Sequence, residues 1–219
     1  MRMTSPERNA ADPGAGAPVA EPPADLDLHS DLELRAALRV TPGLTVLTGG
    51  QTGVDTLAAR AALAAGLSVH VVFPHGFRQE DGALTAERRA ELHGGVLHQL
   101  GSIGFAQRTW TCVSLADAVL LLDPAGGDGC KETVRAAERL ERPLLDLTAY
   151  PVAGGGTGRA DVTGPAVQSF LRQNGARVLM IAGCRGSLLA GQVDYVRSRL
   201  EDVAAALAEC QDQRGTVPD

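Results

Sequence analysis

The chain has few aromatic side chains and no surplus of basic ones. Aromatic residues make up 3% of its 219 residues, and the formal net charge is -6 at pH 7. Proteins that bind nucleic acids usually present a basic surface, and those that bind single strands stack bases on aromatic rings. The composition therefore argues against a nucleic-acid partner.

Long apolar runs and paired cysteines are also missing. No apolar run approaches the roughly 18 to 20 residues that span a bilayer, and the first residues lack the apolar core of a signal peptide. The four cysteines are widely spaced and form no C-x-x-C pair. We interpret them as reduced thiols of a cytoplasmic protein that has no membrane partner. No ligand spacing typical of zinc occurs, so the sequence predicts no metal site.

The N-terminal stretch differs in composition from the rest of the chain. Five of the 12 prolines lie within residues 1–25, among alanines, glycines and charged residues. Such a segment cannot bury enough apolar surface to offset its chain entropy. We therefore expect a disordered Pro/Ala-rich tail over 1–25, a single Rossmann-like ligand-binding domain over 29–210 and a flexible tail over 211–219.

Within the predicted domain, short apolar runs alternate with helical patterns. This alternation is typical of an α/β fold with a mainly parallel sheet and helices on both faces, which is a Rossmann-like three-layer sandwich. We expect the strand order 2-1-3-4-5, with the topological switch between the first and third runs. A further helix is predicted over 85–92. The five runs are residues 44–48, 68–73, 117–123, 142–148 and 177–183.

Two glycine-rich loops each join a predicted strand to a predicted helix. They are "TGGQTG" (48–53) and "DPAGGDGCKET" (123–133). Helix N-termini behind such loops offer free N–H groups and a partial positive charge, which suits phosphate or another oxyanion. The alternative is that the glycines only make tight turns, but two loops beside one crevice favour a binding site. Neither loop is a G-x-G-x-x-G fingerprint or a P-loop, which argues against an NAD-dependent dehydrogenase or a P-loop ATPase.

Four ordered motifs give the sequence a resemblance to a known family. They are "TGGQTGVD" (48–55), "PHGFRQEDG" (74–82), "AQRTWTCVSLADAVLLL" (106–122) and "LMIAGCRGS" (179–187). Together they resemble the family named "putative molybdenum carrier", which belongs to the Rossmann-like nucleotide-binding proteins that include the LOG phosphoribohydrolases. The resemblance implies a binding, carrier or sensor protein for a phosphate-bearing small molecule, either a nucleotide or the molybdenum cofactor.

The resemblance also implies which residues form the site. The first loop would make an anion cradle with an acidic residue in the following helical turn, and the other motifs would complete the pocket. The implied residues are Gly49, Gly50, Gln51, Thr52, Gly53, Asp55, Arg78, Glu80, Asp81, Arg108, Thr109, Gly126, Gly127, Gly129 and Lys131. Simpler roles stay open: Asp55 also suits the dipole of its helix, and Glu80 and Asp81 also suit a solvated loop.

Departures from the family pattern leave the ligand open. His75 replaces a basic residue before glycine, Cys112 replaces asparagine, and Cys130 replaces a hydroxyl residue. His75 beside an anionic ligand would make binding stronger at lower pH.

The alternative function is an enzyme, a phosphoribohydrolase that cleaves nucleoside 5'-monophosphates. In the LOG motif PGGxGTxxE, the glutamate position falls on Thr133 of this chain, while Glu132 lies one residue earlier. A one-residue shift turns a helical side chain by about 100°. The candidate catalytic carboxylates are therefore Glu132 and Asp55.

One expectation concerns assembly. An apolar stripe runs along the helix predicted over about 190–209. A stripe of this kind most often covers a sheet of its own domain. Because related proteins tend to pair through helices, we expect a homodimer.

Overall fold

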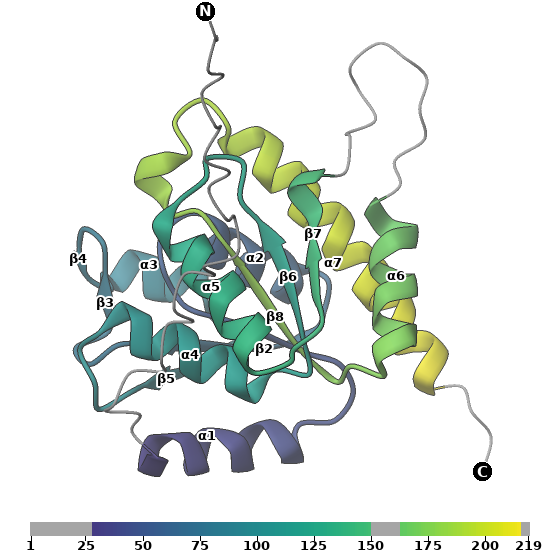
Figure 1. Ribbon diagram of the computed structural model, residues 1–219, viewed down its shortest axis with the longest axis horizontal. Coiled ribbons are helices and arrows are strands. Elements are labelled where there is room, and N and C mark those ends of the chain that lie inside the picture. The colour runs from purple at the N-terminus through teal and green to yellow at the C-terminus, as the bar shows by residue number, and fades with distance from the viewer. Residues whose placement is uncertain (1–27, 150–162, 216–219) are drawn as a thin grey trace, which may run out of the picture.

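The described structure is built around one parallel sheet. The computed structural model describes residues 28–149 and 163–215 (Figure 1). Six strands pair in the order β5-β2-β1-β8-β6-β7, and every pairing is parallel. These strands are β1 (Thr45–Thr48), β2 (Ser68–Phe73), β5 (Val96–Gln99), β6 (Ala118–Leu122), β7 (Leu144–Asp146) and β8 (Val178–Gly183).

Helices cover both faces of this sheet, so the predicted α/β Rossmann-like class is confirmed. One face packs against α2, α6 and α7, and the other against α1, α4 and α5. Figure 1 shows α4 and α5 in front of the sheet and α2 behind it. The helices are α1 (Leu28–Val40), α2 (Val54–Ala64), α3 (Ala86–Glu91), α4 (Phe105–Leu115), α5 (Asp128–Arg139), α6 (Thr163–Asn174) and α7 (Val193–Gly215), with short 3-10 turns η1 (Leu147–Ala149) and η2 (Gly186–Leu188).

The central strands alternate their side chains between two hydrophobic cores. In β8, Leu179 and Ile181 join the core under α2, α6 and α7, whereas Met180 and Ala182 join the core under α4 and α5. Strand β6 divides its residues in the same way. This two-residue period, apolar on both faces, is what a parallel strand between two helix layers requires.

The predicted strand order 2-1-3-4-5 is wrong in one respect. The last strand, β8, lies between β1 and β6 instead of at the edge beyond β7. Its backbone pairs with both neighbours, from Thr45↔Val178 on one side to Leu122↔Gly183 on the other. The apolar runs at 117–123 and 177–183 are equally suited to a central position, so their sequences do not decide which one lies beside β1.

Three smaller features differ from the sequence expectations. A sixth strand, β5, was not predicted, and the polar loop after β2 contains a hairpin formed by β3 (Arg78–Gln79) and β4 (Gly82–Ala83). Helix α7 continues to Gly215, so the first part of the predicted 211–219 tail is helical. The predicted N-terminal tail, 1–25, lies outside the described residues. No helix in the described ranges is long and apolar enough to cross a membrane.

Candidate functional site

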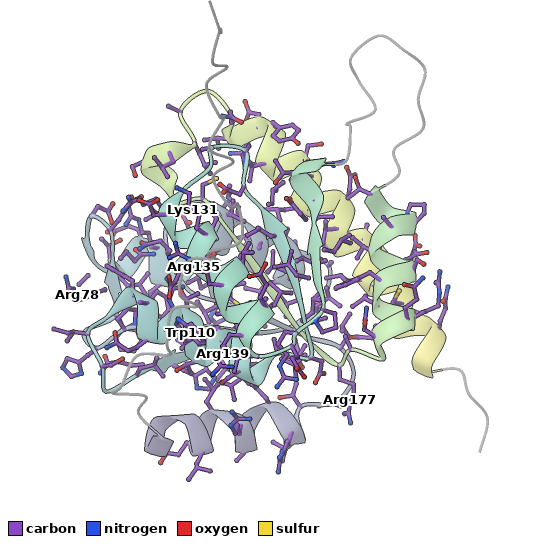
Figure 2. The ribbon with its side chains drawn as sticks, viewed as in Figure 1. Arg78, Trp110, Lys131, Arg135, Arg139 and Arg177 are labelled. Carbon is purple, nitrogen blue, oxygen red and sulfur yellow. The ribbon has the colours of Figure 1, made fainter. Side chains whose placement is uncertain are left out.

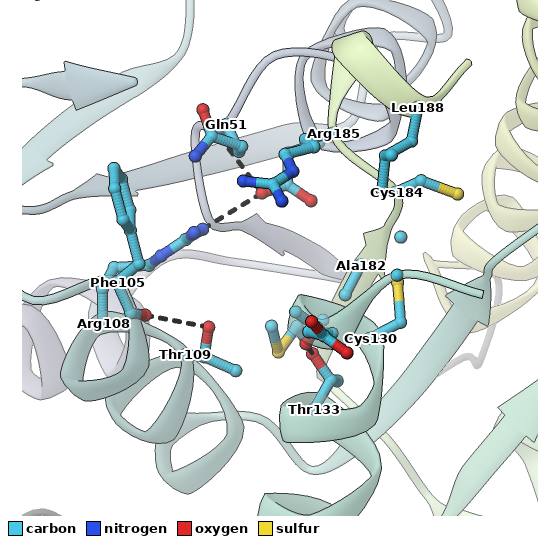
Figure 3. A pocket seen from close by; sticks show the side chains of 16 residues that line it. Gln51, Phe105, Arg108, Thr109, Cys130, Thr133, Ala182, Cys184, Arg185 and Leu188 are labelled. Atoms are coloured by element: carbon cyan, nitrogen blue, oxygen red, sulfur yellow. Dashed lines mark hydrogen bonds and ion pairs between the residues drawn. The ribbon is translucent and has the colours of Figure 1, made fainter. Parts of the chain in front are cut away.

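A cavity lies at the carboxyl ends of the central strands, which is where ligands bind in open α/β sheets. It has a volume of about 200 Å³ and is lined by residues that follow β1, β6 and β8 and by the faces of α4 and α5. Figure 3 shows Arg108 and Thr109 on one wall, Cys130 and Thr133 on another, and Arg185 and Leu188 above them. The sequence predicted a crevice between β1 and β6. In the structure β8 lies between these two strands, and its carboxyl end forms the middle of the crevice.

A buried ion pair crosses one side of the cavity. Arg108 Nη1 lies 3.0 Å from Asp55 Oδ2, and less than a tenth of either side chain is exposed. Burial raises the pKa of the Asp55 carboxyl above its ordinary value, and the charge of Arg108 opposes that shift. The Nε of Arg108 is buried without a hydrogen-bond partner among the described residues. A buried unpaired donor is costly, so the position of Arg108 carries an energetic cost that its pairing with Asp55 only partly offsets.

The first glycine loop makes room for this pair. A Cβ on Gly49 would lie 1.2 Å from Arg108 Nη1 and 2.7 Å from Asp55 Oδ2. At Gly53, where φ is +85°, a Cβ would lie 2.5 Å from the backbone of Cys184 and 2.6 Å from that of Arg185. Glycine at these two positions is therefore required by close approach of other groups, whichever ligand binds.

Three amides at the end of this first loop and the start of α2 have partners within the protein. Gln51 N–H donates to Asp55 Oδ2 at 3.2 Å, and Val54 N–H donates to the Cys184 carbonyl at 3.0 Å. Thr52 N–H donates to the side-chain oxygen of Gln51. The Asp55 carboxylate thus takes the place that an external anion would take, and the predicted anion cradle in this loop stays a prediction.

The second glycine loop leaves donors open. Gly127 is the N-cap of α5, and the next two residues, Asp128 and Gly129, also line the cavity. Within the described residues, the N–H groups of Asp128 and Gly129 donate to no protein acceptor. Asp123 Oδ1 accepts from Gly126 N–H at 2.9 Å and from Gly127 N–H at 3.2 Å and so fixes the loop. The start of α5 therefore offers two free amides and the positive end of a helix dipole to the cavity.

Six of the implied site residues meet at this cavity, and nine do not line it. Those that do are Gln51, Asp55, Arg108, Thr109, Gly127 and Gly129. Those that do not are Gly49, Gly50, Thr52, Gly53, Arg78, Glu80, Asp81, Gly126 and Lys131.

The charged residues outside the cavity have other contacts. Arg78 extends away from the body of the molecule (Figure 2), with its guanidinium 5.7 Å from the centre of the Phe105 ring. Lys131 is exposed and donates to Asp128 at 2.9 Å. Asp81 pairs with Arg88 at 2.6 Å. His75 is exposed and does not line the cavity, so the condition for its predicted effect on binding is not met.

Glu80 joins three segments at the rim of the site. Its carboxylate accepts hydrogen bonds from the hydroxyl of Thr52 and from the hydroxyl and N–H of Ser187. Burial raises the pKa of Glu80, but these hydrogen bonds and the charge of Arg185 outweigh it, so the pKa lies below its ordinary value. Glu80 thus connects the β3–β4 hairpin to the glycine loop before α2 and to the turn after β8.

The residue at the LOG glutamate position, Thr133, and its neighbour Glu132 point their side chains in different directions. Glu132 faces α4, where its carboxylate accepts from Trp110 Nε1 at 2.6 Å and from Arg135 at 3.3 Å. Thr133 is buried, lines the cavity and donates its hydroxyl to the Gly129 carbonyl at 3.1 Å. The LOG glutamate position is therefore occupied by a hydroxyl, and the only candidate catalytic carboxylate that lines the cavity is Asp55.

Two residues that directly follow β8 belong to the site but were not among the residues expected from the sequence. Cys184 and Arg185 line the cavity, and Cys184 Sγ donates to Asp123 Oδ1 at 3.0 Å. Burial raises the pKa of the Cys184 thiol to about 11. Both residues directly follow a predicted strand, which could have identified them as site residues. They were not considered because that strand was expected at the edge of the sheet, away from the crevice.

Comparison with known proteins agrees with this architecture. Residues 46–204 match the circularly permutated YpsA SLOG family. The chain belongs to that family. A late strand placed beside the first one, as β8 is, is consistent with a permuted order of elements.

A solved structure has a similar fold. It is a "putative molybdenum carrier protein" from Syntrophus aciditrophicus, with a TM-score of 0.56 and 22% identity over 76% of this chain and 96% of that chain. The resemblance drawn from the four motifs is confirmed by these two findings. A search of curated proteins gave no match.

Proposed function

We propose that this protein binds a phosphate-bearing small molecule, a nucleotide or the molybdenum cofactor, and acts as a carrier or sensor for it. The observation that carries the proposal is that one cavity holds unpaired donors and a buried acceptor. The donors are the amides of Asp128 and Gly129, with the guanidinium of Arg108 also in the cavity lining, and the acceptor is the Asp55 carboxylate. Membership of the family supports a ligand-binding role.

The arrangement favours a ligand that has both phosphate and hydroxyl groups. A phosphate suits the free amides at the start of α5, which carry partial positive charge. The Asp55 carboxylate would repel a phosphate but accepts hydrogen bonds from hydroxyl groups such as those of ribose. A nucleotide satisfies both requirements, whereas a bare oxyanion such as molybdate satisfies only the first. We therefore place nucleotides ahead of molybdate.

Calorimetric titration with AMP, ADP-ribose, molybdate and the molybdenum cofactor tests the proposal. We expect AMP or ADP-ribose to bind more tightly than molybdate. In Arg108→Gln the affinity should fall by about tenfold or more, because a hydrogen bond to a charged group contributes about 1.5–3 kcal/mol. Arg135→Gln is the matched control, since Arg135 is an exposed arginine on α5 that does not line the cavity. If none of the four probes binds more tightly than millimolar, the proposal is wrong.

The phosphoribohydrolase alternative rests on a different observation. Asp55 is a buried carboxylate beside the cavity, with its pKa raised by burial, and such perturbed groups are candidate acid–base catalysts. If the protein cleaves AMP, release of the free base should be lost in Asp55→Asn and retained in Glu132→Gln. The absence of base release from AMP in the wild-type protein would leave the binding function alone.

We further propose that the protein works in the cytoplasm as a homodimer. None of the four cysteines forms a disulfide, and all are buried, which supports a reducing compartment.

A further inference from the structure

Three potential metal ligands from distant parts of the sequence meet beside the cavity. They are Asp123 at the end of β6, Cys130 in the first turn of α5 and Cys184 directly after β8. One ligand atom from each lies within 4.8 Å of the other two. Both cysteines are only 2% exposed, and both line the cavity. The insertion of β8 beside β6 is what brings Cys184 to Cys130, so the strand order expected from the sequence would have kept them apart.

The donor set is one that zinc prefers. Zn²⁺ binds cysteine thiolates at about 2.3 Å and carboxylate oxygens at about 2.0–2.2 Å, and catalytic-type sites use three protein ligands with a fourth position open. Tetrahedral donors at these bond lengths lie about 3.5–4 Å apart. The three atoms, all within 4.8 Å of one another, need only small side-chain rotations to reach that geometry.

The carboxylate is already held in place by its surroundings. Asp123 Oδ1 accepts the two loop N–H groups of Gly126 and Gly127, and this kind of outer hydrogen bonding orients metal ligands. The thiol of Cys184 points at the same carboxylate.

We propose that Asp123, Cys130 and Cys184 bind one thiophilic divalent cation of the zinc class, with its fourth position open to the cavity. Figure 3 shows the sulfur-bearing side chains of Cys130 and Cys184 at the same end of the cavity. On binding, each thiol loses its proton to solvent and each sulfur forms one bond to the cation, so two protons are released per ion with no change of oxidation state. The site goes beyond the proposed ligand function and does not depend on it.

The test uses the full chain, purified under reducing conditions, freed of metal by a chelator and titrated with Co²⁺ in the absence of any nucleotide. We expect one ion per chain and the near-ultraviolet absorption of thiolate-to-cobalt charge transfer, displaced by an equivalent of Zn²⁺. Cys130→Ser and Cys184→Ser should each lose this band. Asp123→Asn should weaken Co²⁺ binding by about 100-fold or more, because losing even an outer hydrogen-bonding partner of a metal ligand costs about 10- to 100-fold. Circular dichroism checks that each variant is folded.

Cys112→Ala is the matched control, because Cys112 is a buried cysteine that lies outside the cluster. Its band and stoichiometry should equal those of the wild-type protein. The proposal is overturned if the wild-type protein gives no thiolate band, or if the band survives in both serine variants. It is also overturned if the protein, isolated under reducing conditions, contains a Cys130–Cys184 disulfide by mass spectrometry. Because no nucleotide is present, failure here is distinct from failure of the proposed ligand function.

Discussion

At the scale of single residues, Gly49 links the glycine-rich loop to the buried ion pair. Gly49→Ala should destabilise the fold by about 3 kcal/mol, because a Cβ 1.2 Å from Arg108 Nη1 forces that guanidinium off Asp55 and leaves a buried charge without its partner. Urea unfolding of both proteins measures the change. Gly164→Ala is the control, since its Cβ would meet only Ala206 Cβ, at an ordinary 3.8 Å. Equal midpoints for Gly49→Ala and the wild-type protein would contradict this account.

The sequence was informative about residue types at the site but not about their contacts. Asp55 and Arg108 were both singled out, yet nothing in the sequence indicates that they pair across 53 positions. The glycines at 49 and 53 were assigned to a ligand, whereas the structure shows that they also admit Arg108 and the turn after β8. Chemistry can be inferred from residue type and motif, but a contact between two motifs requires the fold.

At the scale of secondary-structure elements, a pair of histidines links β5 to β2 in addition to the backbone pairing of the two strands. Strand β5 pairs with β2, and His70 Nδ1 lies 2.9 Å from His98 Nε2, with the two rings stacked at 5.0 Å. Burial, with a smaller contribution from the charge of His98, lowers the pKa of His70 to about 4. The folded protein therefore binds fewer protons at His70 than the unfolded chain does between pH 6.5 and pH 4.

It follows that the free energy of unfolding should decrease as the pH falls from 6.5 towards 4. At higher pH both states are neutral at this position, so the stability that depends on His70 is fully present there. His70→Gln should reduce the slope of this part of the pH profile, measured as the urea midpoint at each pH, while His98, whose pKa burial also lowers, keeps the remainder. His93→Gln is the matched control, because His93 is exposed. Parallel profiles for the wild-type protein and His70→Gln would contradict the assignment.

The elements themselves were predicted unevenly, and for physical reasons. The strands with continuous apolar runs were found because both their faces are buried, as in β6 and β8. Strand β5, with the sequence VLHQ, has no buried residue and two polar ones. It therefore lacks the continuous apolar run from which the other strands were predicted. The position of β8 in the sheet was predicted wrongly, because equally apolar runs do not indicate which strands lie next to one another.

At the scale of the whole molecule, the structure changes the argument for a homodimer. The stripe on α7 that raised this expectation is buried within the chain except at its first residue: Val196, Leu200, Val203 and Leu207 are all at most 1% exposed, whereas Val193 is 39% exposed. Helix α7 packs on α2 and α6, so this stripe is not free to bind a second copy. An interface has to use another surface, and among the described strands β5 is an edge strand whose outer side has no partner.

Edge strands of this kind tend to pair with another chain, and β5 carries an apolar side chain, Val96, that is 48% exposed. Ile103, shortly after β5, is 63% exposed. We therefore predict a homodimer that forms through the β5 edge, with a light-scattering mass near twice the chain mass of 22.7 kDa at micromolar concentration. Val96→Lys should shift the mass to that of a single chain, because the charge would be buried at the interface. Val193→Lys, at a half-exposed valine that begins α7, should leave the dimer intact. A wild-type mass near 22.7 kDa would reject the dimer, and a dimer that persists in Val96→Lys would reject the β5 edge as its interface.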